Sequence, residues 1–268
     1  MSIKLIVLDL DDTLLGKDLK ISEKNKKALI QAQSLGIRVV LASGRPEAGM
    51  REHAKTLELP EREGWIISYN GGRITRADSQ VPYWECSLTQ EEGLALYDLS
   101  WRENLHFVTY GEEGILTNEV CEYSQVERTL TGLPLVEKSD LRFHLPKTLP
   151  KVILMEHPDI IKRKLPHLKN EWGTRWHITL SKPFFMEFTP FGIEKGAALA
   201  KLCKYLDVLP DQVMAIGDGM NDMGMIKWAG LGLAVANACE ELKVHAQEIT
   251  GHHDEDGVAQ AVLKYCLI

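Results

Sequence analysis

The sequence predicts an α/β fold in which a parallel sheet, covered by helices, is interrupted by a second domain. Short apolar runs alternate with helical segments up to residue 84, and the same alternation returns after residue 188. Strand–helix–strand alternation favours a parallel sheet with right-handed crossovers. Between the two stretches, helical segments stand beside strand candidates without this alternation, which is typical of an α+β insertion.

Local signals predict the elements of the N-terminal stretch. Residues 3–8 form an apolar run typical of a buried strand. Ser22 is a candidate N-cap for a helix that Gly36 ends, and Pro46 fits the first turn of a further helix. The other strands expected here are residues 38–42 and 65–68.

The C-terminal stretch repeats the pattern. We expect helices at residues 195–206, 222–229, 240–246 and 257–265, and strands at residues 213–216 and 231–235. The first and last stretches together predict one core domain, formed by residues 1–84 and 188–268.

The middle of the chain, residues 85–187, is predicted to form an α/β cap domain inserted into this core. Its expected helices are residues 89–103 and 158–171, and its expected strands are residues 106–110, 151–155, 176–180 and 184–188. The chain is expected to cross between the domains near Pro82 and Pro190.

Bulk composition excludes several classes of protein. A net charge of −7 gives no reason to expect a nucleic-acid partner, because proteins that bind nucleic acid usually have a basic face. No apolar stretch reaches the roughly 20 residues that span a bilayer, and the aspartates after residue 8 argue against a signal peptide. The five cysteines form no Cys-x-x-Cys pair and are expected to be reduced. We therefore expect a cytoplasmic protein that binds neither nucleic acid nor membranes; the oligomeric state stays open.

The most informative motif is Asp9-Leu10-Asp11-Asp12-Thr13, directly after the first apolar run. In an extended segment, Asp9 and Asp11 would project to the same side. Adjacent carboxylates repel each other, and a hard divalent cation such as Mg²⁺ would neutralise them. An acidic turn that caps the strand, without chemistry, would explain the same residues.

Two further candidates also follow predicted strands or begin a helix. Ser43 and Gly44 can donate hydrogen bonds to a phosphate at a helix start, although this motif taken alone favours a plain N-cap at Ser43. Lys195 stands at the head of a helix, where its charge opposes the helix dipole unless an anion shares the position.

The segment Gly217-Asp218-Gly219-Met220-Asn221-Asp222 combines glycines with clustered acids after a strand. If a helix starts between Asp218 and Asp222, both carboxylates can address one ion. In an open parallel sheet the carboxyl ends of the strands meet at one edge, where ligands bind. The three segments that follow strands should therefore converge in space.

One other cluster, residues 252–256, contains two histidines and three acids. No further ligands are spaced to complete a metal site, so we expect a solvated loop there.

Taken together, the motifs Asp9-x-Asp11-x-Thr13, Ser43, Lys195 and Gly217-Asp218-x-x-Asn221-Asp222 resemble those of the haloacid dehalogenase-like hydrolases. The large insertion, preceded by Ser68-Tyr69-Asn70-Gly71-Gly72, resembles the Cof-type branch and its sugar-phosphate phosphatases. The resemblance implies a Rossmann-like core with helices on both faces of the sheet. Asp12, where Gly is more common, and Glu194, where Ser is common, depart from the pattern without removing a catalytic group.

The resemblance also implies a mechanism. Asp9 would attack phosphorus to give an aspartyl-phosphate, and Asp11 would act as general acid and base. Mg²⁺ would be held by Asp9, the backbone carbonyl of Asp11 and Asp218, with Asp222 in the outer shell. The phosphoryl oxygens would be bound by Ser43, Lys195, Asn221 and the amides of Leu10 and Gly44.

The predicted activity is hydrolysis of small phosphorylated metabolites, sugar phosphates foremost. Three alternatives remain: a phosphatase of cofactors such as pyridoxal phosphate or flavin mononucleotide, a phosphosugar mutase, and a non-catalytic phospho-ligand sensor. The presence of both Asp9 and Asp11 argues against the sensor.

Overall fold

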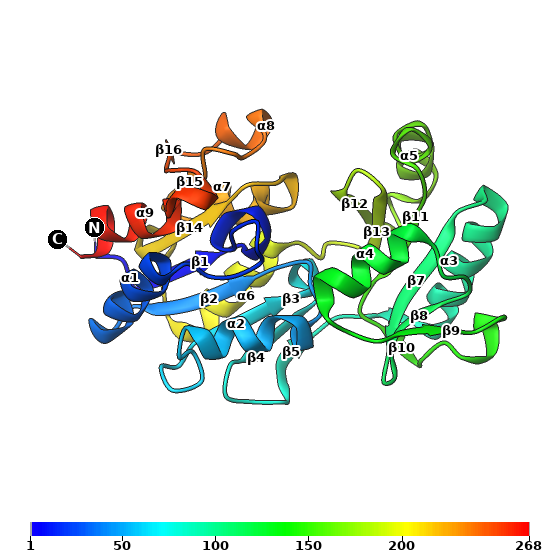
Figure 1. Ribbon diagram of the computed structural model, residues 1–268, viewed down its shortest axis with the longest axis horizontal. Helices are drawn as coiled ribbons and strands as arrows, with labels where there is room; N and C mark the ends of the chain where they lie inside the picture. Colours follow the sequence, from blue (N-terminus) through cyan, green and yellow to red (C-terminus); the bar gives the residue numbers. More distant parts are fainter. Residues whose placement is uncertain (1, 268) are drawn as a thin grey trace. The chain divides into compact units, whose positions relative to one another are not determined.

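The computed structural model describes residues 2–267, which divide into two compact units (Figure 1). The first unit comprises the residues up to Trp84 and those from Glu194 onward, and the second is Glu85–Ile193. The second unit therefore extends past residue 187, where the sequence analysis ended the insertion. The reason is that strand β13 (Phe185–Pro190) is hydrogen-bonded into the sheet of the second unit.

The first unit is built on an eight-stranded sheet with the order β16-β15-β14-β1-β2-β3-β4-β5. Its strands are β1 (Leu5–Leu8), β2 (Arg38–Ala42), β3 (Trp65–Ser68), β4 (Arg73–Arg76), β5 (Pro82–Glu85), β14 (Val213–Gly217), β15 (Leu231–Ala234) and β16 (Glu248–Ile249). The strands from β16 through β3 pair in parallel, and β4 joins β3 antiparallel. The predicted α/β class is confirmed; β4, β5 and β16 were not predicted.

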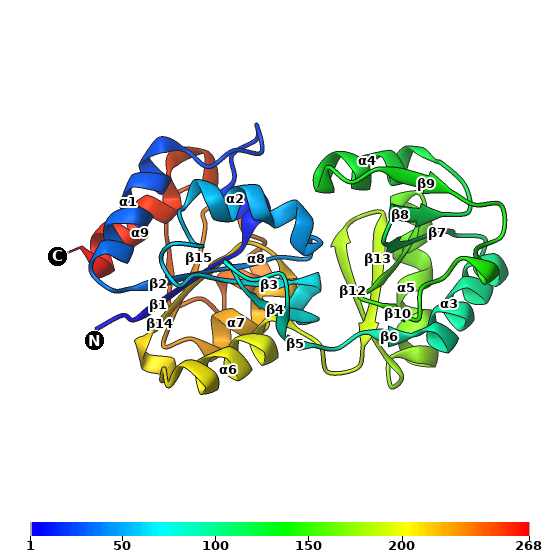
Figure 2. The same ribbon diagram turned by 90° about the horizontal axis from the view of Figure 1, so that it is seen from below.

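Helices cover both faces of this sheet, as predicted. They are α1 (Glu23–Ser34), α2 (Arg51–Thr56), α6 (Lys195–Leu206), α7 (Met223–Trp228), α8 (Glu240–Lys243) and α9 (Gly257–Cys266). Figure 2 shows α1, α2 and α9 on one face and α6 and α7 on the other. Ser22 caps α1 as expected, because its hydroxyl accepts a hydrogen bond from the amide of Asn25.

Several short helical turns connect the longer elements. They are Leu10–Leu14, Glu47–Met50, Tyr69–Gly71, Leu141–Phe143, Pro210–Gln212, Met220–Asp222 and His253–Glu255. The helix expected at Pro46 starts as one of these turns, Glu47–Met50, before α2 begins.

The register of the central strands sets the position of the candidate motifs. Leu8 of β1 pairs with Leu41 of β2 on one side and with Ile216 of β14 on the other. Since the three strands run parallel, their carboxyl ends lie at the same level. Asp9 and Asp218, each just past its strand, therefore reach one edge of the sheet.

The second unit has a six-stranded sheet of order β12-β13-β11-β7-β8-β9 and a small sheet, β10-β6. Besides β13, its strands are β6 (Leu88–Thr89), β7 (His106–Gly111), β8 (Gly114–Thr117), β9 (Leu135–Glu137), β10 (Thr148–Leu149), β11 (Val152–Met155) and β12 (Trp176–Lys182). Its helices are α3 (Gln90–Glu103), α4 (Glu122–Thr131) and α5 (Pro158–Trp172). Of these helices, α4 was not predicted.

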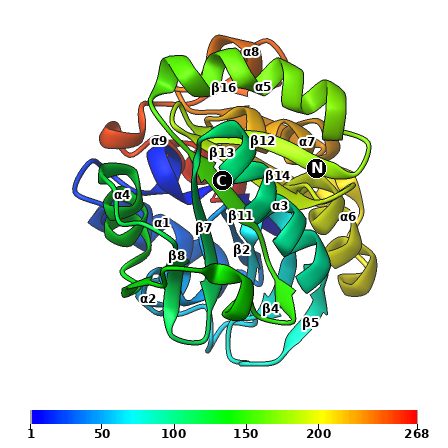
Figure 3. The same ribbon diagram turned by 90° about the vertical axis from the view of Figure 1, so that its right-hand side faces the viewer.

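Helices α3 and α5 pack on one face of the six-stranded sheet, and residues of both join its apolar core (Figure 3). Beside this core lies a buried ion pair, in which Lys151 Nζ is 2.7 Å from Glu187 Oε1. The hydroxyl of Ser181 donates to the same oxygen. Buried charges of this kind need both partners, because removing one leaves the other uncompensated.

Close packing between α6 and α7 gives a test of the fold of the first unit. A Cβ at Gly196 would lie 2.5 Å from the backbone carbonyl carbon of Gly224, so Gly196→Ala forces the two helices apart. We expect a loss of about 1–3 kcal/mol in the free energy of unfolding, measured by urea titration. Ala197→Ser, at an exposed position of the same helix, is the control. A Gly196→Ala protein as stable as the control would contradict the close approach.

Candidate active site

The strand edge brings together four of the predicted residues in one hydrogen-bonded group. Lys195 Nζ lies 2.5 Å from Asp9 Oδ1 and 2.6 Å from Asp222 Oδ1. The Lys195 side chain is fully buried, and so is that of Asp222. The ammonium thus joins the residue after β1, 186 positions away in sequence, to the turn after β14, 27 positions away.

The other oxygens of this group are also engaged. Asp222 Oδ2 accepts hydrogen bonds from the amides of Asp218 and Gly219, each at 3.0 Å. The hydroxyl of Thr13 donates to Asp218 Oδ1 at 3.0 Å. Asp222 therefore fixes the loop that carries Asp218, and Thr13 fixes the Asp218 side chain.

Burial makes the charges of this group costly. It raises the pKa of Asp9 well above the usual value, against the opposing effect of Lys195. Burial also raises the pKa of Asp218 to about 7, and the carboxylate of Asp222 adds to the effect. For Lys195, the carboxylates of Asp222 and Asp9 outweigh burial, which alone would lower its pKa, and keep it charged.

The donor set fits a hard divalent cation. Asp9, Asp218 and Asp222 each offer a carboxylate oxygen within 4.8 Å of the others. Three carboxylates and one ammonium leave a formal charge of −2 when all are ionised, which a divalent cation would balance. Asp9 and Asp218 are the better direct ligands, because both oxygens of Asp222 already accept hydrogen bonds.

Asp11 lies in a tight turn that begins directly after Asp9. The chain turns at Leu10–Leu14, and Asp12 adopts a left-handed conformation with φ of 60°. The carboxylate of Asp11 accepts two hydrogen bonds from the guanidinium of Arg45, one from Nε at 2.9 Å and one from Nη2 at 2.5 Å. The carboxylates of Asp9 and Asp11 are therefore held by different cations, Lys195 and Arg45.

Ser43 and Gly44 lie at the same edge, but Ser43 is no helix N-cap. Its hydroxyl accepts a hydrogen bond from the Arg45 amide, and the next helical turn begins only at Glu47. Ser43 and Gly44 therefore do not lie at the helix start that the sequence predicted. The hydroxyl of Ser43 and the amide of Gly44 remain candidate donors to a phosphate. Leu10 is buried at the start of the turn after β1.

Asn221 lies in the turn Met220–Asp222 and donates through Nδ2 to Asn70 Oδ1 at 3.2 Å. Sequence reasoning named Asn221 but gave no function to Thr13, Arg45 or Asn70. Thr13 and Asn70 stand in motifs that were noted, and Arg45 directly follows Ser43 and Gly44, so proximity in sequence to the named residues was the available signal. What the sequence could not show is which partner each side chain contacts.

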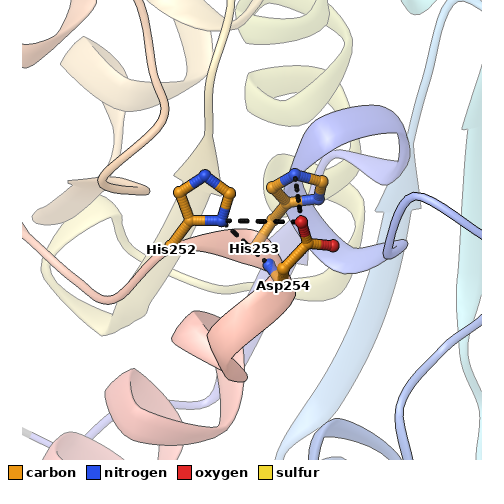
Figure 4. A group of neighbouring side chains, drawn as sticks. All are labelled: His252, His253 and Asp254. Atoms are coloured by element: carbon orange, nitrogen blue, oxygen red, sulfur yellow. Dashed lines mark hydrogen bonds and ion pairs between the residues drawn. The ribbon is translucent and has the colours of Figure 1, made fainter.

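Residues 252–254 form a second group of possible metal ligands, shown in Figure 4. His252 Nδ1 accepts a hydrogen bond from the amide of Asp254, and Asp254 forms an ion pair with Lys17 at 2.9 Å. His253 is buried, with Nδ1 2.8 Å from the carbonyl oxygen of Leu15. The segment is thus not the fully solvated loop that was expected: these contacts fasten it to the N-terminal segment.

Membrane insertion through a helix finds no support within residues 2–267, since none of their helices combines the length and apolar character that spanning requires.

Comparison with known proteins identifies the family of this chain. Residues 6–262 match the model of a family described as haloacid dehalogenase-like hydrolase. A haloacid dehalogenase-like hydrolase from Bacteroides thetaiotaomicron is 36% identical, with a TM-score of 0.90 over 98% of this chain and 99% of that one.

Two curated proteins of Bacillus subtilis (strain 168) are similar along their length. The putative phosphatase YxeH is 32% identical over 97% of both chains. The 5-amino-6-(5-phospho-D-ribitylamino)uracil phosphatase YcsE is 33% identical over 100% of this chain and 97% of the relative.

The chain belongs to the haloacid dehalogenase-like hydrolases. It is an enzyme of the phosphatase class within that family, of the Cof type, and these predictions from the sequence are confirmed.

The raised pKa of Asp218 gives a prediction for the metal-free protein. A carboxyl with a pKa near 7 when folded and 3.8 as its ordinary value holds a proton in the folded state between these limits. Its contribution to stability therefore falls as pH rises from about 4 to 7. Asp218→Asn should raise the melting temperature at pH 8 in chelator, by roughly 2–4 °C per kcal/mol relieved.

The same difference should be smaller at pH 5 and vanish below about pH 4, where Asp218 is protonated in both the folded and the unfolded wild type. Asp207→Asn, an exposed residue in a left-handed conformation, removes one charge elsewhere and serves as control. A lower melting temperature for Asp218→Asn at pH 8, relative to this control, would show that the ionised Asp218 carboxylate does not destabilise the folded protein.

Proposed function

We propose that this enzyme is a Mg²⁺-dependent phosphatase that hydrolyses small phosphorylated metabolites, sugar phosphates foremost, through an aspartyl-phosphate on Asp9. The observation that carries the proposal is the buried group in which Lys195 holds Asp9 beside Asp218 and Asp222. A buried carboxylate fixed at a strand end, with a cation next to it, is suited to in-line attack on a phosphoryl group.

Asp9 is the proposed nucleophile because one of its oxygens is held by Lys195, which fixes the orientation of the carboxylate. Fixing the nucleophile lowers the entropic part of the barrier. The same ammonium, with the hydroxyl of Ser43, the carboxamide of Asn221 and the amides of Leu10 and Gly44, would bind the phosphoryl oxygens.

Asp11 is the proposed general acid and base. Asp11 follows Asp9 by two residues, and hydrogen bonds from Nε and Nη2 of Arg45 orient its carboxylate. Held in this way, it would protonate the leaving alkoxide and then accept a proton from the water that hydrolyses the acyl-phosphate.

Asp9, Asp218 and the backbone carbonyl of Asp11 would hold Mg²⁺, with Asp222 supporting Asp218 from outside the coordination sphere. The cation would reduce the repulsion between the nucleophilic carboxylate and the anionic phosphate.

The groups above recognise phosphate and not the alcohol attached to it. We therefore propose that the inserted domain, predicted as residues 85–187, supplies the contacts that distinguish one leaving group from another. Among relatives, the name of the B. subtilis enzyme YcsE states a substrate with its phosphate on a ribityl chain. That substrate supports phosphate esters of sugars and polyols as the class to test first.

A substrate panel tests the proposed activity. Wild-type enzyme with Mg²⁺ should release phosphate from a generic aryl phosphate and from sugar or polyol phosphates, and exhaustive chelation should abolish release because the acid cluster lacks its balancing cation. Preference for pyridoxal phosphate or flavin mononucleotide would favour a cofactor phosphatase. Isomerised sugar phosphate without free phosphate would favour a mutase, and full activity without metal would refute the metal assignment.

Substitutions separate the two carboxylates. Asp9→Asn should eliminate turnover and the phosphate burst in rapid-quench measurements, because an amide is a poor nucleophile. Asp11→Asn should reduce kcat by at least about 100-fold, since an amide cannot shuttle the proton. Asp12→Asn is a matched control: Asp12 is exposed and left-handed, a conformation that Asn tolerates. Equal losses of kcat in all three variants would contradict the proposal that Asp9 is the nucleophile and Asp11 the general acid and base.

A further inference from the structure

The turn Tyr69–Gly71, which follows β3, has an unusual backbone that the proposed mechanism does not use. Tyr69 and Asn70 both have φ of 54°, and Gly71 has φ of 103°. Left-handed conformations cost energy for residues other than glycine, and consecutive ones persist only where the surroundings enforce them. The turn is buried, and only 6% of Asn70 is exposed.

Backbone hydrogen bonds fasten this turn to the segment that follows β2. The amide of Asn70 donates to the carbonyl of Ser43 at 3.0 Å, and the amide of Tyr69 donates to that of Arg45 at 3.1 Å. In return the amide of Ser43 donates to the carbonyl of Ile67 at 2.9 Å. The turn and the Ser43–Arg45 segment are therefore held as one unit.

The side chain of Asn70 adds two contacts. Its Oδ1 accepts from Asn221 Nδ2 at 3.2 Å. Its carboxamide also packs on Gly44, where an added Cβ would lie 3.1 Å from Asn70 Nδ2. One side chain thus touches Asn221 and Gly44, two residues proposed to supply donors to the phosphoryl oxygens, and these come from segments far apart in the sequence.

Gly71, the next residue of the turn, contacts the segment that carries Lys195, a third residue proposed to bind the phosphoryl oxygens. A Cβ at Gly71 would lie 2.4 Å from the carbonyl oxygen of Glu194 and 3.2 Å from the amide nitrogen of Lys195. The turn therefore packs directly against the start of α6, the helix that carries Lys195.

We propose that Asn70 is a positioning residue of the phosphoryl site. Its carboxamide holds that of Asn221 and the backbone at Gly44 at a fixed separation, so that both are already placed when phosphate binds. This inference rests on the proposed function, since it concerns the same site. The left-handed backbone is what directs the Asn70 side chain between the two segments.

Asn70→Gly is the sharpest variant, because glycine adopts the left-handed backbone without strain and only the side chain is lost. Asn104→Gly is the matched control. Asn104 is also a left-handed asparagine, with φ of 51°, but it is exposed at the end of α3 in the second unit.

The experiment compares wild type, both variants and Asn221→Ala with Mg²⁺ and an aryl phosphate. Inhibition by orthovanadate, which mimics the transferring phosphoryl group, and melting temperature are measured in parallel. Asn70→Gly should lower kcat/KM and the affinity for orthovanadate by about 10-fold or more, while Asn104→Gly matches wild type.

A double variant, Asn70→Gly with Asn221→Ala, separates positioning from general stability. If Asn70 acts through Asn221, the double variant should be little worse than the poorer single variant. Additive losses, or an Asn70→Gly enzyme with wild-type kinetics, would overturn the inference and leave the proposed function standing. A wild-type enzyme without phosphatase activity would overturn both. Should Asn70→Gly fail to fold, Asn70→Ser removes the carboxamide that holds Asn221 and leaves a short polar side chain, and kinetics equal to wild type would again overturn the inference.

Discussion

The site depends on the buried ammonium of Lys195. It lies between Asp9 and Asp222 at hydrogen-bond distance from both, and those two carboxylates come from opposite ends of the chain. Without this cation, the buried Asp9 and Asp222 and the half-buried Asp218 would face one another with no opposite charge beside them, and burial already raises the pKa of Asp9 and Asp218. A buried ion group of this kind contributes little net stability, because desolvation opposes the attraction. Its consequence is geometric: it fixes the carboxylate of Asp9, the proposed nucleophile.

The sheet register provides the other constraint. Leu8, Leu41 and Ile216 stand at one level of three parallel strands, so the segments that follow must emerge together. Each segment then turns away differently: after β1 through the turn at Leu10–Leu14, and after β14 through hydrogen bonds to Asp222. The turn after β3 fastens the segment after β2 to Asn221. Preorganised donors of this type are what phosphoryl transfer requires.

Much of this arrangement could be predicted from the sequence, because it follows from periodicity and strand order. Helix α6 begins at Lys195 and ends at Leu206, as expected, and the convergence of the motifs follows from parallel strands. The side-chain partners could not be predicted. The bond between Asp11 and Arg45 depends on a tight turn that breaks the expected extension, and no periodicity encodes that turn. The end of the insertion was also misplaced, since β13 pairs with strands of the second unit.

The central claim is that Asp9 is the nucleophile and that Asp9 and Asp218 share one divalent cation. A crystal structure of the enzyme with Mg²⁺ and fluoroberyllate, a mimic of the phosphoryl group, tests it most directly. We expect beryllium bonded to a carboxylate oxygen of Asp9, Mg²⁺ coordinated by Asp9 and Asp218, and Asp222 still bonded to Lys195. Fluoroberyllate on Ser43 or Thr13, or Mg²⁺ absent from this cluster and present elsewhere, would contradict the account.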